Sequence, residues 1–236
     1  RLLSGLQDET LTIVGARPAM GKTSFALGIA AHIGIRKALP AVVFSLEMSQ
    51  MELSQRILCS EARVDATNIR NGMLSSEDWA KINSATGKLG DAQIWIDDNP
   101  NVTIMEIRSK ARRLRSRLGD LGLVVVDYLQ LMSGRSNAEN RQVEISEISR
   151  GLKILARELE CPVVALSQLS RQLEMRADKR PMLADLRESG AIEQDVDVVM
   201  FIYRDDVYNL DSPDRGTAAI LISKHRNGPT GMVRLA

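Results

Sequence analysis

The sequence predicts an α/β fold with a mostly parallel central sheet, helices on both faces of the sheet and a C-terminal antiparallel hairpin. Short β-rich runs alternate with helix-like segments through most of the 236 residues. Most of these runs are apolar without in/out alternation, which is typical of central strands covered on both faces. The last two runs have no helix between them, and the residues joining them include Asn227, Gly228 and Pro229, which favour a turn. Residues 1–236 are therefore predicted to form one doubly wound domain.

Eight segments have the length and composition of strands. In chain order they are residues 11–14, 41–46, 94–96, 123–126, 163–166, 198–202, 218–223 and 232–235. The final pair is expected to form the hairpin at one edge of the sheet.

Two helices are expected to begin with a capping box, in which a hydroxyl side chain precedes an acid by three residues. Ser75 and Asp78 begin one of them, with Trp79 and Ile82 as its expected packing anchors. The other box, Thr103-x-x-Glu106, begins a helix to about residue 118 whose apolar positions form one stripe.

Cations on this later helix are expected to point away from the sheet. They are Arg108, Lys110, Arg112, Arg113, Arg115 and Arg117. A nucleic-acid surface is one interpretation, but a solvated or subunit-facing surface is favoured.

The bulk composition is that of an ordinary globular protein, with 44% hydrophobic and 26% charged residues. A net charge of +1 does not by itself indicate nucleic-acid binding, and 3% aromatic residues disfavour a surface built on base stacking. Cys59 and Cys161 lack metal-ligand spacing with the two histidines and are expected to be reduced core residues of a cytoplasmic protein. We see no membrane span and no signal peptide.

The stretch from Thr12 to Thr23, T-I-V-G-A-R-P-A-M-G-K-T, joins the first expected strand to an expected helix at residues 24–33. This strand–loop–helix context is that of a phosphate-binding P-loop, in which Lys22 reaches the β/γ-phosphates and Thr23 ligates Mg²⁺. The residues expected to bind the nucleotide are Ala16, Arg17, Pro18, Ala19, Met20, Gly21, Lys22, Thr23 and Ser24. The prediction is a site for ATP or another NTP with Mg²⁺.

One position departs from the pattern G-x-x-x-x-G-K-[ST]. Counting back from Gly21, the first glycine should be at position 16, which is Ala16, whereas the glycine is Gly15. The alternative is a chance Gly-Lys-Thr at a helix start. The strand, Gly15, Pro18 and the helix together favour the NTP site.

Three further residues end or follow expected strands, where ligands of parallel sheets bind. Asp127 ends an apolar run in the form of a Walker B strand and is expected to support Mg²⁺. Glu47, expected beside a partner of the P-loop strand, is either a water-polarising base or a helix N-terminal acid. Gln168 either senses the γ-phosphate or caps a loop. Arg56 lies in the helix expected after Glu47 and is interpreted as an ordinary surface arginine.

Two later segments suggest contacts with phosphate groups. Arg187 and the nearby Gly190 offer a charge and a bare backbone N–H to a phosphodiester. Lys224 and Arg226 lie at the hairpin, where a cation suits an arginine finger supplied in cis or in trans.

With these segments in place, the sequence resembles the C-terminal motor domain of DnaB-type replicative DNA helicases, a RecA-like fold. The matching motifs are G-A-R-P-A-M-G-K-T, F-S-L-E-M, V-V-V-D-Y-L-Q-L-M, A-L-S-Q-L, D-L-R-E-S-G-A-I-E-Q-D and K-H-R-N-G-P. They occur in the family's order over nearly the whole chain, and the family commonly has alanine at position 16. The resemblance covers only the motor domain, so the family's N-terminal domain and linker helix are expected to be absent from this chain.

For the nucleotide site, the resemblance implies that Glu47 is the catalytic glutamate and that Gln168 is a sensor. It also implies that Arg56 contacts the terminal phosphate from the same subunit. Lys22 and Thr23 would bind the phosphates and Mg²⁺, and Asp127 would support the metal.

For DNA, the resemblance implies that Arg187, Glu188 and Gly190 grip a single strand, and that Lys224 and Arg226 reach into the neighbour's nucleotide site. The implied partners are single-stranded DNA, five further copies in a homo-hexamer, and a helicase loader and primase for the full-length protein. The resemblance also implies 5′-to-3′ movement and a cytoplasmic location for a protein that is either bacterial or phage-encoded. The rival readings are a RecA-like recombination or repair ATPase and a monomeric P-loop kinase for a small molecule.

Overall fold

A computed structural model describes residues 2–127, 129, 132, 141–186 and 194–236 of the chain. The described residues form an eight-stranded sheet in the order β3-β2-β4-β5-β1-β6-β7-β8. The strands are β1 (Leu11–Ala16), β2 (Ala41–Ser45), β3 (Ile94–Asp97), β4 (Leu123–Asp127), β5 (Val163–Gln168), β6 (Val198–Tyr203), β7 (Ala218–His225) and β8 (Gly231–Leu235). Strands β1 to β6 pair in parallel, as the apolar runs predicted.

The α-helices are α1 (Lys22–Ala31), α2 (Gln50–Ala62), α3 (Ala66–Asn71), α4 (Ser76–Gly90), α5 (Ile104–Leu118) and α6 (Arg141–Leu159). A π-helix, η1 (His32–Arg36), continues α1. Three short 3₁₀ segments are η3 (Arg171–Met175), η4 (Leu183–Asp185) and η5 (Asp205–Val207).

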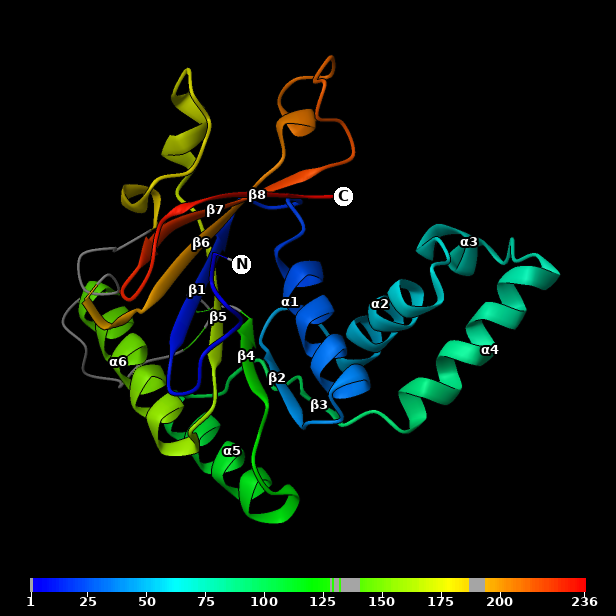
Figure 1. The fold of residues 1–236 in the computed structure, drawn as a ribbon, viewed down its shortest axis with the longest axis horizontal. Coiled ribbons are helices and arrows are strands. Elements are labelled where there is room, and N and C mark those ends of the chain that lie inside the picture. The colour runs from blue at the N-terminus through cyan, green and yellow to red at the C-terminus, as the bar shows by residue number, and fades with distance from the viewer. Residues whose placement is uncertain (1, 128, 130–131, 133–140, 187–193) are drawn as a thin grey trace.

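The sheet lies between two helical layers, with α5 and α6 on one face and α1 and α2 on the other (Figure 1). Alternate residues of β1 face opposite layers: Ile13 packs in the α5–α6 core, and Val14 packs in the α1–α2 core. Both residues are fully buried. The predicted sheet with helices on both faces is confirmed.

The C-terminal hairpin is also confirmed. Strand β7 pairs antiparallel with β6, with a register shift between Val199 and Met200, and β8 pairs antiparallel with β7. Strand β8 is exposed along its length and forms one edge of the sheet (Figure 1).

Both predicted capping boxes are present, at the starts of α4 and α5. In α4, Ile82 is buried as predicted, but Trp79 is 55% exposed, so its prediction as a packing anchor is wrong. The small core beside α4 is completed by Leu74, which lies just before the helix, and by Ile69 of α3.

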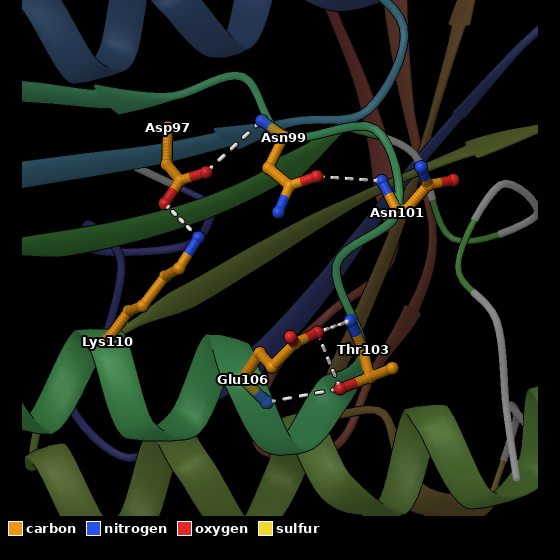
Figure 2. Close-up of polar contacts among 6 residues, drawn as sticks. All are labelled: Asp97, Asn99, Asn101, Thr103, Glu106 and Lys110. Atoms are coloured by element: carbon orange, nitrogen blue, oxygen red, sulfur yellow. Dashed lines mark hydrogen bonds and ion pairs between the residues drawn. The ribbon is translucent and has the colours of Figure 1, made fainter.

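The link from β3 into α5 is fixed by side chains (Figure 2). Lys110 donates to Asp97 across 2.5 Å, and the N–H of Asn99 donates to the same carboxylate. Thr103 and Glu106 complete the capping box reciprocally. These contacts explain why α5 begins at Ile104, directly after its N-cap Thr103.

Several cations of α5 bind acids on the same chain. Arg108 and Arg112 contact Glu158, and Arg115 contacts Glu160. Both acids lie at the C-terminal end of α6 or just beyond it. The ion pairs tie α5 to α6 and therefore weaken the nucleic-acid interpretation of this surface.

The two cysteines, Cys59 and Cys161, are buried and free, as predicted. Among the described residues, no helix is long and apolar enough to cross a membrane.

Candidate nucleotide-binding site

The P-loop lies at the carboxyl end of β1, a strand in the interior of the sheet between β5 and β6. Helix α1 begins at Lys22, two residues earlier than predicted, because Gly21 occupies the N-cap position with a left-handed φ of 91°. Ala19 is also left-handed, with φ of 64°. The two left-handed residues turn the chain into the start of α1. The first turn of α1 contains no acid, and no side chain caps its backbone N–H groups. Such an end attracts anions.

A pocket of about 230 Å³ opens at the P-loop. Its lining includes residues 16–19 and 21–24 together with Glu47, Met48, Arg56 and Gln168. We call it the P-loop pocket. Met20, which the sequence grouped with the nucleotide-binding residues, is only 3% exposed and packs in the α1–α2 core.

Lys22, Thr23 and Asp127 meet at the base of this pocket. The Thr23 hydroxyl donates to Asp127 Oδ2 at 2.6 Å, and Lys22 Nζ lies 3.1 Å from Asp127 Oδ1. Asp127 is 1% exposed, so these two contacts offset the cost of burying its polar side chain. Strand β5 separates β4 from β1 in the sheet.

The chemistry of these residues fits Mg²⁺. The Oδ1 atom of Asp127 is buried and accepts no hydrogen bond from the described residues, although Lys22 lies beside it. A hydroxyl and a carboxylate are oxygen ligands of the kind that Mg²⁺ takes beside phosphates. Thr23 and Asp127 are therefore the residues that would hold the ion or its waters.

Glu47, Arg56 and Gln168 reach the same pocket from three different elements. Gln168 ends β5 and pairs in register with Ala16 of the P-loop strand. Arg56 lies in α2, and exposed Glu47 lies in the turn between β2 and α2. The expectation that Glu47 lies beside a partner of the P-loop strand is wrong. Strand β2 pairs with β3 and β4, whereas β1 pairs with β5 and β6.

The acid in the first turn of α2 is Glu52, not Glu47. Ser49 is the N-cap of α2, and Glu52 completes its capping box. The backbone N–H of Ser49 holds the pKa of Glu52 below its usual value. Glu47 lies two residues before this cap, so it remains available to a ligand in the pocket.

The glycine that departs from the P-loop pattern has a packing reason. A Cβ at Gly15 would lie 2.8 Å from a ring carbon of Phe201 and 2.9 Å from Leu169. Gly15 faces the α5–α6 core, where Phe201 is fully buried, whereas Ala16 faces the opposite core.

Arg17 connects the P-loop to the strand that carries Gln168. Its guanidinium donates to the carbonyl of Leu169 at 2.8 Å and to Glu174 of η3 at 2.8 Å. Arg17 is 8% exposed. The sequence predicted its place in the loop but not this internal anchor.

The remaining predicted residues are outside the P-loop pocket. Arg187, Glu188 and Gly190 lie outside the described residues. Lys224 is in β7 and Arg226 follows it, and neither is among the described residues that line the P-loop pocket. Arg226 instead contacts the carbonyl of Gln194 and the carboxylate of Asp197.

Sequence reasoning missed Asp197. It is 7% exposed and immediately precedes β6. The sequence signal for Asp197 is an acid directly before an apolar strand. It lies at the amino end of the strand, whereas the sequence predicted ligand-binding residues at the carboxyl ends of strands.

Comparisons with known proteins show which family the chain belongs to. A family model, the DnaB-like helicase C terminal domain, matches residues 1–236. The replicative DNA helicase DnaB of Geobacillus stearothermophilus is 55% identical over 238 residues, covering 100% of this chain and 52% of that protein. The replicative DNA helicase DnaC of Bacillus subtilis (strain 168) is 51% identical, with the same coverages. The chain thus spans about half the length of these relatives.

Two solved structures have the same fold. One is a DnaB-like replicative helicase described with its interactions with primase, with a TM-score of 0.96 at 40% identity, covering 100% of this chain and 57% of that chain. The other is the ATPase domain of G40P, with a TM-score of 0.92 at 41% identity, covering 97% of this chain and 82% of that chain. The chain therefore belongs to the DnaB-like helicase C-terminal domain family.

Proposed function

We propose that this chain is the motor domain of a replicative DNA helicase, which hydrolyses ATP at the subunit boundaries of a hexameric ring and so moves along single-stranded DNA. The observation that carries the proposal is the composition of the P-loop pocket. It brings a phosphate-binding loop together with Glu47 and Gln168, and Asp127 contacts two of its lining residues, Lys22 and Thr23. Its lining does not include the hairpin cation Arg226 of its own chain. A neighbouring copy would supply that cation.

Within one subunit, each residue has a separate task. The N–H groups at the start of α1 and Lys22 bind the phosphates. Thr23 and Asp127 would hold Mg²⁺, which supplies charge neutralisation on the phosphate oxygens when bound. Glu47 orients the attacking water and accepts its proton, and Gln168 contacts the γ-phosphate. Arg56 adds a positive charge from α2 to the terminal phosphate.

Arg226 would complete the site in trans. An arginine finger accelerates phosphoryl transfer by about 10³–10⁵, so an unassembled subunit should hydrolyse ATP slowly. Lys224, on the same hairpin, would assist it. Hydrolysis would then depend on assembly, which is how a ring motor coordinates its subunits.

DNA would be held through its backbone. Arg187, Glu188 and Gly190 are the proposed contacts with a single strand. Binding through phosphates is blind to sequence and weakens as salt rises. When the γ-phosphate leaves, Gln168 would lose its contact with it, and the loop after β5 would transmit this change to the DNA-binding segment.

The proposed partners are single-stranded DNA, further copies of the chain, and a helicase loader and primase for the natural protein that contains it. One related structure is described with its interactions with primase. A cytoplasmic location follows from this function. The family comparisons favour neither the recombination ATPase nor the small-molecule kinase.

ATP hydrolysis by the natural protein, measured with and without single-stranded DNA, tests the proposal. We expect DNA to stimulate hydrolysis; a rate that ignores DNA would contradict the motor function. Mixed assemblies of Lys22→Ala and Arg226→Ala subunits test the shared site. Each variant alone should be inactive, and mixing should restore hydrolysis where an intact P-loop meets an intact Arg226. No recovery in verified mixed assemblies would reject a finger in trans.

A further inference from the structure

Asp197 lies where β1, α6 and the hairpin meet. Its Oδ2 atom accepts a hydrogen bond from the N–H of Leu11 at 2.8 Å and one from Lys153 Nζ at 2.6 Å. Lys153, on α6, also donates to the carbonyl of Glu9 at 2.8 Å. One oxygen of the carboxylate is thus fixed by a strand backbone and a helix cation.

The other oxygen faces Arg226. Arg226 Nη1 lies 3.5 Å from Asp197 Oδ1, and Nη2 donates to the Gln194 carbonyl at 2.8 Å. The backbone N–H of Arg226 donates to the carbonyl of Asp197 at 2.8 Å. Main chain and side chain of Arg226 are therefore both held against residues just before β6.

These contacts leave part of the guanidinium for another ligand. The Arg226 side chain is 45% exposed, whereas that of Asp197 is 10% exposed. An arginine has five N–H donors, and the contacts above use few of them. A long side chain that is already held loses less conformational freedom when it meets a phosphate.

We propose that Asp197 is a positioning residue for Arg226, holding the finger in the orientation in which its free donors face the neighbour's nucleotide. This inference rests on the proposed supply of Arg226 in trans. Asp197 itself touches no nucleotide, so its loss slows hydrolysis only at the site that receives the finger. A substitution of Asp197 in one chain should therefore slow hydrolysis in the P-loop pocket of the adjacent chain and not in its own pocket.

Mixed assemblies of the natural protein measure this direction. In the parent mixture, Lys22→Ala chains donate the finger and Arg226→Ala chains bind ATP. Asp197→Asn is placed first on the donor and then on the ATP-binding chain. We expect kcat to fall about tenfold with the donor and less than about twofold with the ATP-binding chain, with KM for ATP unchanged in both. Equal losses in the two arrangements would overturn the proposal, because a structural defect has no direction.

Lys153→Gln on the donor is the matched control, since it removes the other cation beside Asp197 while the Leu11 N–H still holds Oδ2. We expect less than about a twofold change; a loss as large as that of Asp197→Asn would also overturn the proposal. Where Asp197→Asn fails to fold, Asp197→Glu keeps the charge beside Lys153 but displaces the carboxylate, and the same directional loss is expected. A parent mixture without activity would instead reject the finger in trans.

Discussion

The Thr23 hydroxyl donates to Asp127 Oδ2 over 2.6 Å, joining the first turn of α1 to the end of β4 across the intervening β5. Lys22 contacts the other oxygen of the same carboxylate. The residues proposed for Mg²⁺ thus already touch each other, and a buried acid is stabilised by the groups that would share the ion and the phosphates with it.

Asp127→Asn should leave the fold intact and slow ATP hydrolysis by about 100-fold or more. The amide keeps the size of the carboxylate and an oxygen for Thr23, but it loses the negative charge that supports the metal, whose catalytic effect amounts to several kcal/mol. Steady-state hydrolysis across a Mg²⁺ titration measures the effect.

Asp97→Asn is the matched control. Asp97 also ends a strand, β3, but its partner is Lys110, whereas Asp127 contacts Lys22 and Thr23 of the P-loop. Asp97→Asn should retain nearly full activity. Equal activity of the two variants at all Mg²⁺ concentrations would remove Asp127 from the metal site.

Gly15→Ala should destabilise the protein by about 1–3 kcal/mol, because the added methyl group overpacks a filled core. Its Cβ would meet Phe201 and Leu169 at less than 3.0 Å. Urea unfolding measures the free energy. Gly28→Ala is the control, since no atom lies within 4 Å of its Cβ on α1, and it should stabilise by up to about 1 kcal/mol.

Phe201→Leu, added to Gly15→Ala, should recover part of the lost stability by making room for the methyl group. An unchanged unfolding free energy in Gly15→Ala alone would show that the core yields easily. In that case, packing against Phe201 would not explain the glycine at this position.

The strands and the P-loop were predictable because their signals are local. Each of the eight predicted runs became a strand, with ends moved by a few residues, and Asp127 followed from an apolar run that ends in an acid. Gly21 and Lys22 lie within a short contiguous motif. A local pattern determines such features without knowledge of the sheet order.

Contacts between distant strands were not predictable. The place of β2 relative to β1 depends on strand order, which the sequence alone did not show. The contact of Arg17 with Leu169 exists because β5 pairs with β1, and the contact of Arg226 with Asp197 exists because β7 pairs with β6. Trp79 is exposed although its position in the helix predicted packing. Position within one helix does not show how much of that helix a neighbouring element covers.

Alkaline pH should destabilise the protein partly through Cys161. Burial raises the pKa of this thiol from 9.0 to about 12. The unfolded chain therefore ionises Cys161 first, and the stability that the neutral thiol contributes is full below about pH 9 and is lost as pH rises toward 12. Each pKa unit corresponds to about 1.4 kcal/mol.

Urea unfolding of the protein and of Cys161→Ala, from about pH 8 to about pH 11, tests this. The variant should be less stable at the lower pH because of the cavity, but its stability should fall less steeply. Tyr203, whose pKa is also raised to about 12, remains in both proteins and cancels in the comparison. Parallel pH profiles would show that Cys161 does not contribute.

Glu47→Gln should still bind ATP but should lower kcat by about 10²–10⁴, the range of general base catalysis. The amide can contact a water but cannot take its proton. Glu52→Gln provides the control from the first turn of the adjoining helix, because Glu52 completes the cap of α2 and does not line the P-loop pocket. We expect it to lower the melting temperature slightly and to leave kcat unchanged. Retained turnover in Glu47→Gln, or an equal loss of kcat in both variants, would assign the attacking water to another residue.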